Sequence, residues 1–230
     1  MKKDSVLDVS LPQTNEAMRN YLLGNWDEAR SGFQALLEKD PENHFIYFIL
    51  GEILYAMGKL SDAVDQYTRA TELKPDFGIA FYKMGVCYYR MGKLEKSLKS
   101  FSTLLDMKDQ SHAMASYFYG IINYFLGNDQ EAERGFTILR SESKESHISN
   151  FYLALLKMKH QKYDESLTLL DELLTSTPNL AEVHYMKGTV YMSMYRHLDA
   201  IASFRKALEL NPRDARAKAS LELLTEVPEP

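Results

Sequence analysis

The sequence has little cysteine and no long apolar run. Cys87 is the single cysteine among 230 residues, so no disulfide can form within the chain, which fits a reducing compartment. No stretch approaches the roughly 18 apolar residues of a membrane span. Acidic residues at positions 4 and 8 fall where a signal peptide needs an apolar run of about 7–15 residues. We therefore expect a cytoplasmic protein that does not insert into a membrane.

Positive charge is also in short supply. Lys and Arg number 27 against 32 Asp and Glu, which gives a net charge of −5. An acidic chain does not attract phosphate backbones in general. The cations Lys83, Arg90 and Lys159 are too dispersed along the sequence to follow a nucleic-acid backbone. We expect no nucleic-acid partner.

The motifs of catalysis and metal binding are missing as well. The six histidines form no metal-ligand spacing such as HExxH, and no glycine-rich phosphate loop is present. Cys87 lies within the helical pattern 81–90, which favours a buried small hydrophobic residue over a nucleophile. We therefore expect no enzyme, no cofactor and no metal site.

What the chain does contain is a period. Pro41 and Pro75 are 34 residues apart, and so are Pro178 and Pro212. Glycines and alanines recur with the same spacing, and a one-residue slip falls in the polar segment 108–112. Because three residue types share one period and one slip, the repeat is a property of the fold.

Each period contains two segments with apolar residues at i, i+3, i+4 and i+7, which predicts two amphipathic helices. A glycine separates the two segments in four copies and predicts a left-handed helix cap; these glycines are Gly24, Gly58, Gly92 and Gly127. Prolines then end the second helix. The period-two alternation of a β-sheet is absent, so the sequence predicts an all-α fold.

A 34-residue period with Leu-Gly, Ala, an aromatic residue and Pro at fixed offsets resembles the tetratricopeptide repeat family. The clearest copy carries Gly51, Ala63, Tyr67, Ala70 and Pro75 in the signature places. Six copies cover residues 10–214, as 10–43, 44–77, 78–111, 113–146, 147–180 and 181–214. The resemblance implies a right-handed superhelical α-solenoid of helix-turn-helix repeats with a concave groove.

Three further segments complete the expected organisation. Residues 1–9 form a flexible N-terminal arm, and 228–230 form a short tail. Residues 215–227 are expected to form the capping helix that solvates the last face of such an array. The polar segment Ser141–Asn150 lacks the closing proline and is interpreted as a loosened joint between the fourth and fifth repeats.

By the same resemblance, one face of each first helix lines the groove. That face is rich in aromatic residues, and its candidate protein-binding residues are Phe45, Phe48, Tyr55, Tyr82, Tyr89, Tyr117, Tyr124, Phe151 and Tyr185. Two of these segments, 81–90 and 116–125, are apolar or aromatic almost all round, so each must bury a second face. Two interpretations stay open: the rings form a ligand-binding groove, or they bury one another in packing.

We expect a non-catalytic scaffold or adaptor that binds an apolar-anchored peptide or helix of a partner protein in this groove. The alternative is a self-assembling scaffold, in which the groove or the array ends bind another copy. Some family members clamp a C-terminal carboxylate with a set of Lys and Asn residues. No three consecutive copies carry that set here, so this mode is not expected.

Overall fold

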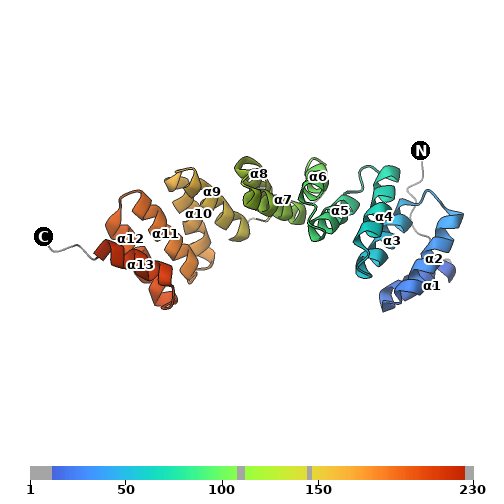
Figure 1. Cartoon of the computed structure of the whole chain (residues 1–230), viewed down its shortest axis with the longest axis horizontal. Helices are drawn as coiled ribbons and strands as arrows, with labels where there is room; N and C mark the ends of the chain where they lie inside the picture. The colour runs from blue at the N-terminus through green and yellow to red at the C-terminus, as the bar shows by residue number, and fades with distance from the viewer. Residues whose placement is uncertain (1–11, 108–111, 144–146, 226–230) are drawn as a thin grey trace. The chain divides into compact units, whose positions relative to one another are not determined.

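The structure is a computed structural model that describes residues 12–107, 112–143 and 147–225 (Figure 1). Within these ranges the chain forms thirteen α-helices and no strand, which confirms the all-α prediction. The helices are α1 (Pro12–Leu23), α2 (Trp26–Lys39), α3 (His44–Ala56), α4 (Leu60–Leu73), α5 (Gly78–Arg90), α6 (Leu94–Leu105), α7 (Ala113–Leu126), α8 (Asp129–Glu142), α9 (His147–Lys159), α10 (Tyr163–Ser176), α11 (Ala181–Ser193), α12 (His197–Leu210) and α13 (Ala215–Thr225).

The turns inside the helix pairs follow the sequence prediction. Gly24, Gly58, Gly92 and Gly127 all have positive φ, between 70° and 79°. A left-handed residue at this place lets the chain leave the first helix and start the second within two residues. The fifth and sixth pairs put Gln161 and Tyr195 at the same place, each with φ of 59°. These two side chains therefore occupy a backbone conformation that costs L-residues free energy.

Small residues let the paired helices approach closely. A Cβ added at Gly51 would lie 2.4 Å from the ring of Tyr67, and one at Gly85 would lie 2.5 Å from Phe101. Such distances are shorter than van der Waals contact, so only glycine fits. These glycines therefore lie where the paired helices contact each other.

The described residues divide into two compact units, with the boundary between Ile122 and Asn123 inside α7. Unit 1 contains α1 to α6 and most of α7, and unit 2 contains the end of α7 and α8 to α13. One large residue from each second helix is completely buried; these are Phe33, Tyr67 and Phe101 in unit 1 and Phe136, Leu170 and Phe204 in unit 2. Burial of these large apolar groups stabilises each hairpin against its neighbour.

Helix α13 follows the repeats, as expected for the capping helix. Asp214 accepts hydrogen bonds from the backbone N–H groups of Arg216 and Ala217, which fixes the start of the helix. Ala217 is buried, while most of the helix is exposed. At the expected joint, α8 ends at Glu142 and α9 begins at His147. Residues 144–146 of that joint, the arm 1–9 and the tail 228–230 lie outside the described residues.

Candidate protein-interaction surface

The first helices carry the aromatic residues predicted to bind a partner. Six of them lie in unit 1, on α3, α5 and α7: Phe45, Phe48, Tyr55, Tyr82, Tyr89 and Tyr117. Unit 2 holds the other three, Tyr124, Phe151 and Tyr185. Tyr89 is the most open, with 41% of its surface exposed, and the other eight are half-buried. Each ring therefore contacts its neighbours and still keeps a face accessible.

In unit 1, Phe118 on α7 holds the tyrosines together. Its ring stacks on Phe101 with centroids 5.5 Å apart and planes 8° apart. Tyr82, Tyr89 and Tyr117 surround it with ring centroids 6.4, 5.5 and 5.4 Å away. Edge and tilted contacts at these distances are favourable for aromatic rings. The tyrosines are therefore placed by a half-buried ring that was absent from the predicted site.

Unit 2 repeats this arrangement with Tyr152 on α9. Its ring stacks on Phe136 at 4.9 Å, with planes 6° apart. Tyr124 and Phe151 contact Tyr152 edge-on at 5.0 and 5.4 Å. Phe118 and Tyr152 are 34 residues apart, so the same repeat position supplies the supporting ring in both units.

The equivalent position on α5 is Lys83, and here an ion pair replaces the stacked ring. Lys83 Nζ donates to Glu52 Oε2 at 2.7 Å, and the Tyr67 hydroxyl donates to the other oxygen of the same carboxylate. The side chains of Glu52 and Lys83 are only 17% and 25% exposed. A half-buried carboxylate that accepts a hydrogen bond on each oxygen is held more firmly than a carboxylate in a surface ion pair. The pair therefore fixes α3, α4 and α5 against one another.

Cations also flank Tyr55 on α3. Lys83 Nζ lies 5.6 Å from its ring centre, and the Arg90 guanidinium carbon lies 4.8 Å away. Both distances fall within the range of a cation–π interaction. Within the described residues, Tyr55 is the one predicted ring of unit 1 that contacts two cations.

The environment keeps the nearby tyrosines protonated. Burial raises the pKa of Tyr67, and its hydrogen bond to Glu52 raises the pKa further. Burial likewise raises the pKa of Tyr21 and of Tyr82, and the charge of Glu52 adds to the effect at Tyr21. At neutral pH these hydroxyls therefore act as hydrogen-bond donors beside apolar ring faces.

Tyr185 in unit 2 has a different neighbour. The guanidinium carbon of Arg216, from α13, lies 4.5 Å from its ring centre. Arg216 also pairs with Glu182 and Asp214, which holds it over the ring. Helix α13 thus covers part of this predicted residue, and the most open of the nine rings, Tyr89, lies in unit 1.

Cys87 is fully buried in unit 1, and burial raises the pKa of its thiol to about 11. A thiol in this state is a poor nucleophile, which supports the packing interpretation over the catalytic one. No group of three or more His, Cys, Asp or Glu side chains within residues 12–107, 112–143 and 147–225 is placed to hold a metal ion. None of the helices in the same ranges combines the length and the apolarity that a bilayer crossing requires.

A cavity of about 630 Å³, lined by both polar and apolar residues, lies at α1 and α2. Its wall includes Gln13, Glu16, Asn20, Asp27 and Lys39. Later helices carry large apolar residues at several of the same repeat positions, such as Leu50, in the place of Glu16. The first hairpin therefore carries polar side chains where later hairpins carry apolar ones.

Solved structures with the same fold include several tetratricopeptide repeat proteins. YrrB, described as a TPR protein with an unusual peptide-binding site, has a TM-score of 0.72 at 19% identity, covering 82% of this chain and 96% of its own. The C-terminal part of a TPR repeat-containing protein from Cytophaga hutchinsonii has a TM-score of 0.72 at 17% identity. The match covers 89% of this chain and 84% of that one. MamA has a TM-score of 0.65 at 19% identity, and the match covers 76% of this chain and 96% of MamA.

Family models agree with the structural likeness. A TPR repeat model matches residues 51–92, a tetratricopeptide repeat model matches 181–214, and a second such model matches 17–43 and 79–107. No curated protein matches the sequence. Since the matched segments, the 34-residue period and the stacked hairpins all agree, the chain belongs to the tetratricopeptide repeat family.

Proposed function

We propose that this protein is a non-catalytic scaffold or adaptor, located in the cytoplasm, that binds an apolar-anchored peptide or helix of a partner protein with the aromatic faces of its first helices. The nine predicted aromatic residues carry the proposal, since Tyr89 is exposed and the other eight are only partly buried. Monomeric proteins rarely leave a cluster of large rings open to water without a binding role. The likeness to YrrB, described as having a peptide-binding site, supports the same class of function.

The chemistry of the surface favours apolar anchors. Tyrosine gives a large ring with few rotatable bonds and a hydroxyl donor, and it is enriched among residues that dominate binding energies. In unit 1 the rings of Tyr82, Tyr89 and Tyr117 meet around Phe118, so their accessible faces form one surface. An extended segment or an amphipathic helix with apolar side chains at regular spacing fits such a surface.

The test is capture of partners from native lysate by the wild-type chain and by the triple variant Tyr82→Ser, Tyr89→Ser and Tyr117→Ser. We expect the triple variant to lose a protein that the wild type retains, while circular dichroism shows unchanged helicity. Tyr195→Ser is the matched control, because this tyrosine is 82% exposed and lies on the turn before α12, away from the predicted rings. Identical captures from the wild type and the triple variant would refute the proposal.

Self-assembly remains the second candidate function. The polar side chains of Gln13, Glu16 and Asn20 argue against stacking of the array through its first hairpin, because taking polar groups out of water is costly. Binding of a second copy through the aromatic surface is still compatible with the structure. Sedimentation over a concentration series separates the two functions, since an adaptor keeps the mass of one chain and a self-assembling scaffold gains mass.

A further inference from the structure

The positive charge beside Tyr55 is the feature that the proposed function leaves unused. Arg90 is the last residue of α5, is exposed, and lies with its guanidinium carbon 4.8 Å from the centre of the Tyr55 ring. It forms no ion pair with an acidic side chain in the described part of the chain. Tyr89, which precedes Arg90 in the sequence, is the most exposed of the nine predicted rings.

The equivalent cation of unit 2 shows what Arg90 lacks. Lys159 ends α9 at the same repeat position and pairs with Asp129 at 2.7 Å, an acid at the start of the preceding second helix. In unit 1 the residue that corresponds to Asp129 is Leu60, the first residue of α4. Leucine cannot neutralise a guanidinium, so the counter-ion built into unit 2 has no counterpart next to Arg90.

The acid of this cluster, Glu52, already has two partners. Glu52 accepts hydrogen bonds from Lys83 Nζ and from the Tyr67 hydroxyl, one on each carboxylate oxygen. Glu52 and Lys83 cancel in charge, so the group of Glu52, Lys83 and Arg90 carries one net positive charge, located at Arg90. Stacking on Tyr55 orients the planar guanidinium and leaves its N–H edges available to a carboxylate.

We propose that Arg90, held on Tyr55, is a specificity subsite for an acidic side chain of the bound segment, placed next to an apolar anchor that lies on Tyr89. The proposal rests on the proposed function and adds a charge rule to it: the partner segment carries Asp or Glu beside its apolar residue. Charge complementarity selects this ligand, because a basic side chain would meet an unneutralised guanidinium.

The test uses a phage-displayed library of random twelve-residue peptides, selected on the full chain. We expect enriched peptides that share an aromatic or large aliphatic residue with Asp or Glu close to it in sequence. The same selection on Arg90→Glu is expected to replace the acid by Lys or Arg. An acidic side chain exchanged for its amide should weaken binding of a selected peptide to the wild type about tenfold and to Arg90→Glu little, as measured by fluorescence anisotropy.

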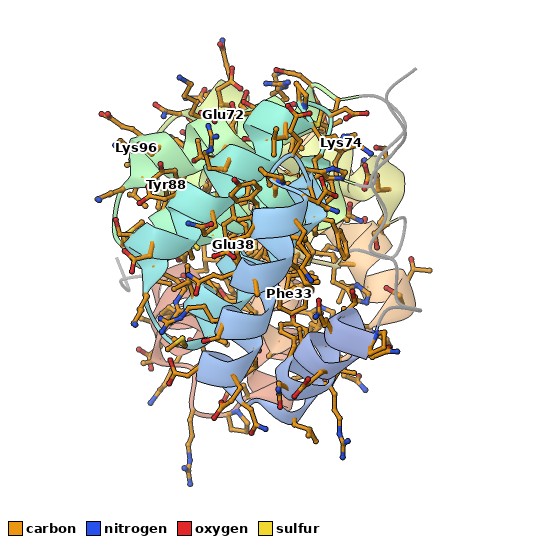
Figure 2. The ribbon with its side chains drawn as sticks, turned by 90° about the vertical axis from the view of Figure 1, so that its right-hand side faces the viewer. Phe33, Glu38, Glu72, Lys74, Tyr88 and Lys96 are labelled. Atoms are coloured by element: carbon orange, nitrogen blue, oxygen red, sulfur yellow. The ribbon has the colours of Figure 1, made fainter. Side chains whose placement is uncertain are left out.

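Lys96→Glu is the matched control. Lys96 Nζ lies 5.7 Å from the Tyr88 ring centre, and Figure 2 shows Lys96 and Tyr88 close together. It is thus another exposed cation stacked on a tyrosine of the same unit, but its ring is not one of the nine predicted. We expect Lys96→Glu to select the same acidic peptides as the wild type. If Lys96→Glu selected basic peptides instead of acidic ones, the preference would follow the overall charge of the protein. That result would overturn the role of Arg90.

The failure of this inference is distinguishable from failure of the proposed function. Peptides that bind the wild type without any acidic preference, or the same peptides selected by Arg90→Glu, overturn the subsite and leave the adaptor function standing. A wild-type chain that enriches no peptide and gains mass with concentration assigns the surface to a second copy. That result overturns both.

Discussion

At the residue scale, the interaction surface depends on which residue each repeat carries at a single equivalent position. The position of Phe118 and Tyr152 supplies a ring that stacks on the preceding repeat, and at Lys83 it supplies a cation instead. The residue type at this one position therefore changes the chemistry of the face. The aromatic pattern of the sequence singles out the nine rings, and their role in binding a partner stays a prediction. The Glu52–Lys83 pair was not predicted, because the partners are 31 residues apart and meet only through stacking of the helices.

Tyr195 gives a residue-scale prediction about stability. It has φ of 59° at the place where four other repeats have glycine, and its ring is 82% exposed. Replacement by glycine removes the left-handed strain and loses little buried surface, so Tyr195→Gly should raise the free energy of unfolding by about 0.5–1 kcal/mol. Urea unfolding measures this difference. Tyr195→Phe keeps the strained backbone and should match the wild type; a Tyr195→Gly variant no more stable than the wild type would contradict the argument.

At the element scale, the helices end where local chemistry stops them. The second helices α2, α4, α10 and α12 each end two residues before a proline, and the first helices of four repeats end at a glycine with positive φ. Both signals are local in sequence, which is why the helix pairs could be predicted without a structure. The ion pairs between α8, α9 and α10 were not predicted. They depend on which polar residues the stacking brings together.

The α8–α9–α10 ion pairs predict how stability depends on pH. Hydrogen bonding by Lys159 lowers the pKa of Asp129, and Lys157 lowers that of Glu165 in the same way. A carboxyl whose pKa is lower in the folded state stabilises the fold above its unfolded pKa, near 4, and loses this contribution as the pH falls through its folded pKa. The wild type should therefore lose stability below about pH 4.

Asp129→Asn isolates one of these groups. The variant should unfold at a lower urea concentration than the wild type at pH 7, because it lacks the charge that Lys159 and His160 contact. Below about pH 4 the carboxyl is protonated in the unfolded chain, so the difference between the two proteins should shrink as the pH falls towards the lowered pKa of folded Asp129. A difference that stays constant from pH 7 to pH 3 would show that the ion pair contributes nothing.

At the scale of the whole molecule, contacts run between helices that are neighbours in sequence, as in other repeat arrays. Such a fold can be predicted from its period, since each repeat packs on the next one. The division into two compact units was not predicted. It falls between Ile122 and Asn123 in the middle of an uninterrupted helix, where the sequence contains neither proline nor a glycine turn.

The expected joint at Ser141–Asn150 is a separate prediction about the whole molecule. Its sequence is polar and lacks a closing proline, so its amides should exchange with deuterium faster than those in the middle of α10. Hydrogen exchange read by mass spectrometry makes the comparison within one sample. Protection across Ser141–Asn150 equal to that of α10 would contradict a loosened joint.

The central claim is that the aromatic face of unit 1 binds the partner, and photo-crosslinking tests it most directly. A photoreactive phenylalanine analogue replaces Tyr89 in one preparation and Tyr195 in another, since both rings are exposed and only Tyr89 belongs to the predicted surface. After irradiation in lysate, the account predicts a covalent adduct with a partner protein from position 89 and none from position 195. The same adduct from both positions, or an adduct from position 195 alone, would contradict it.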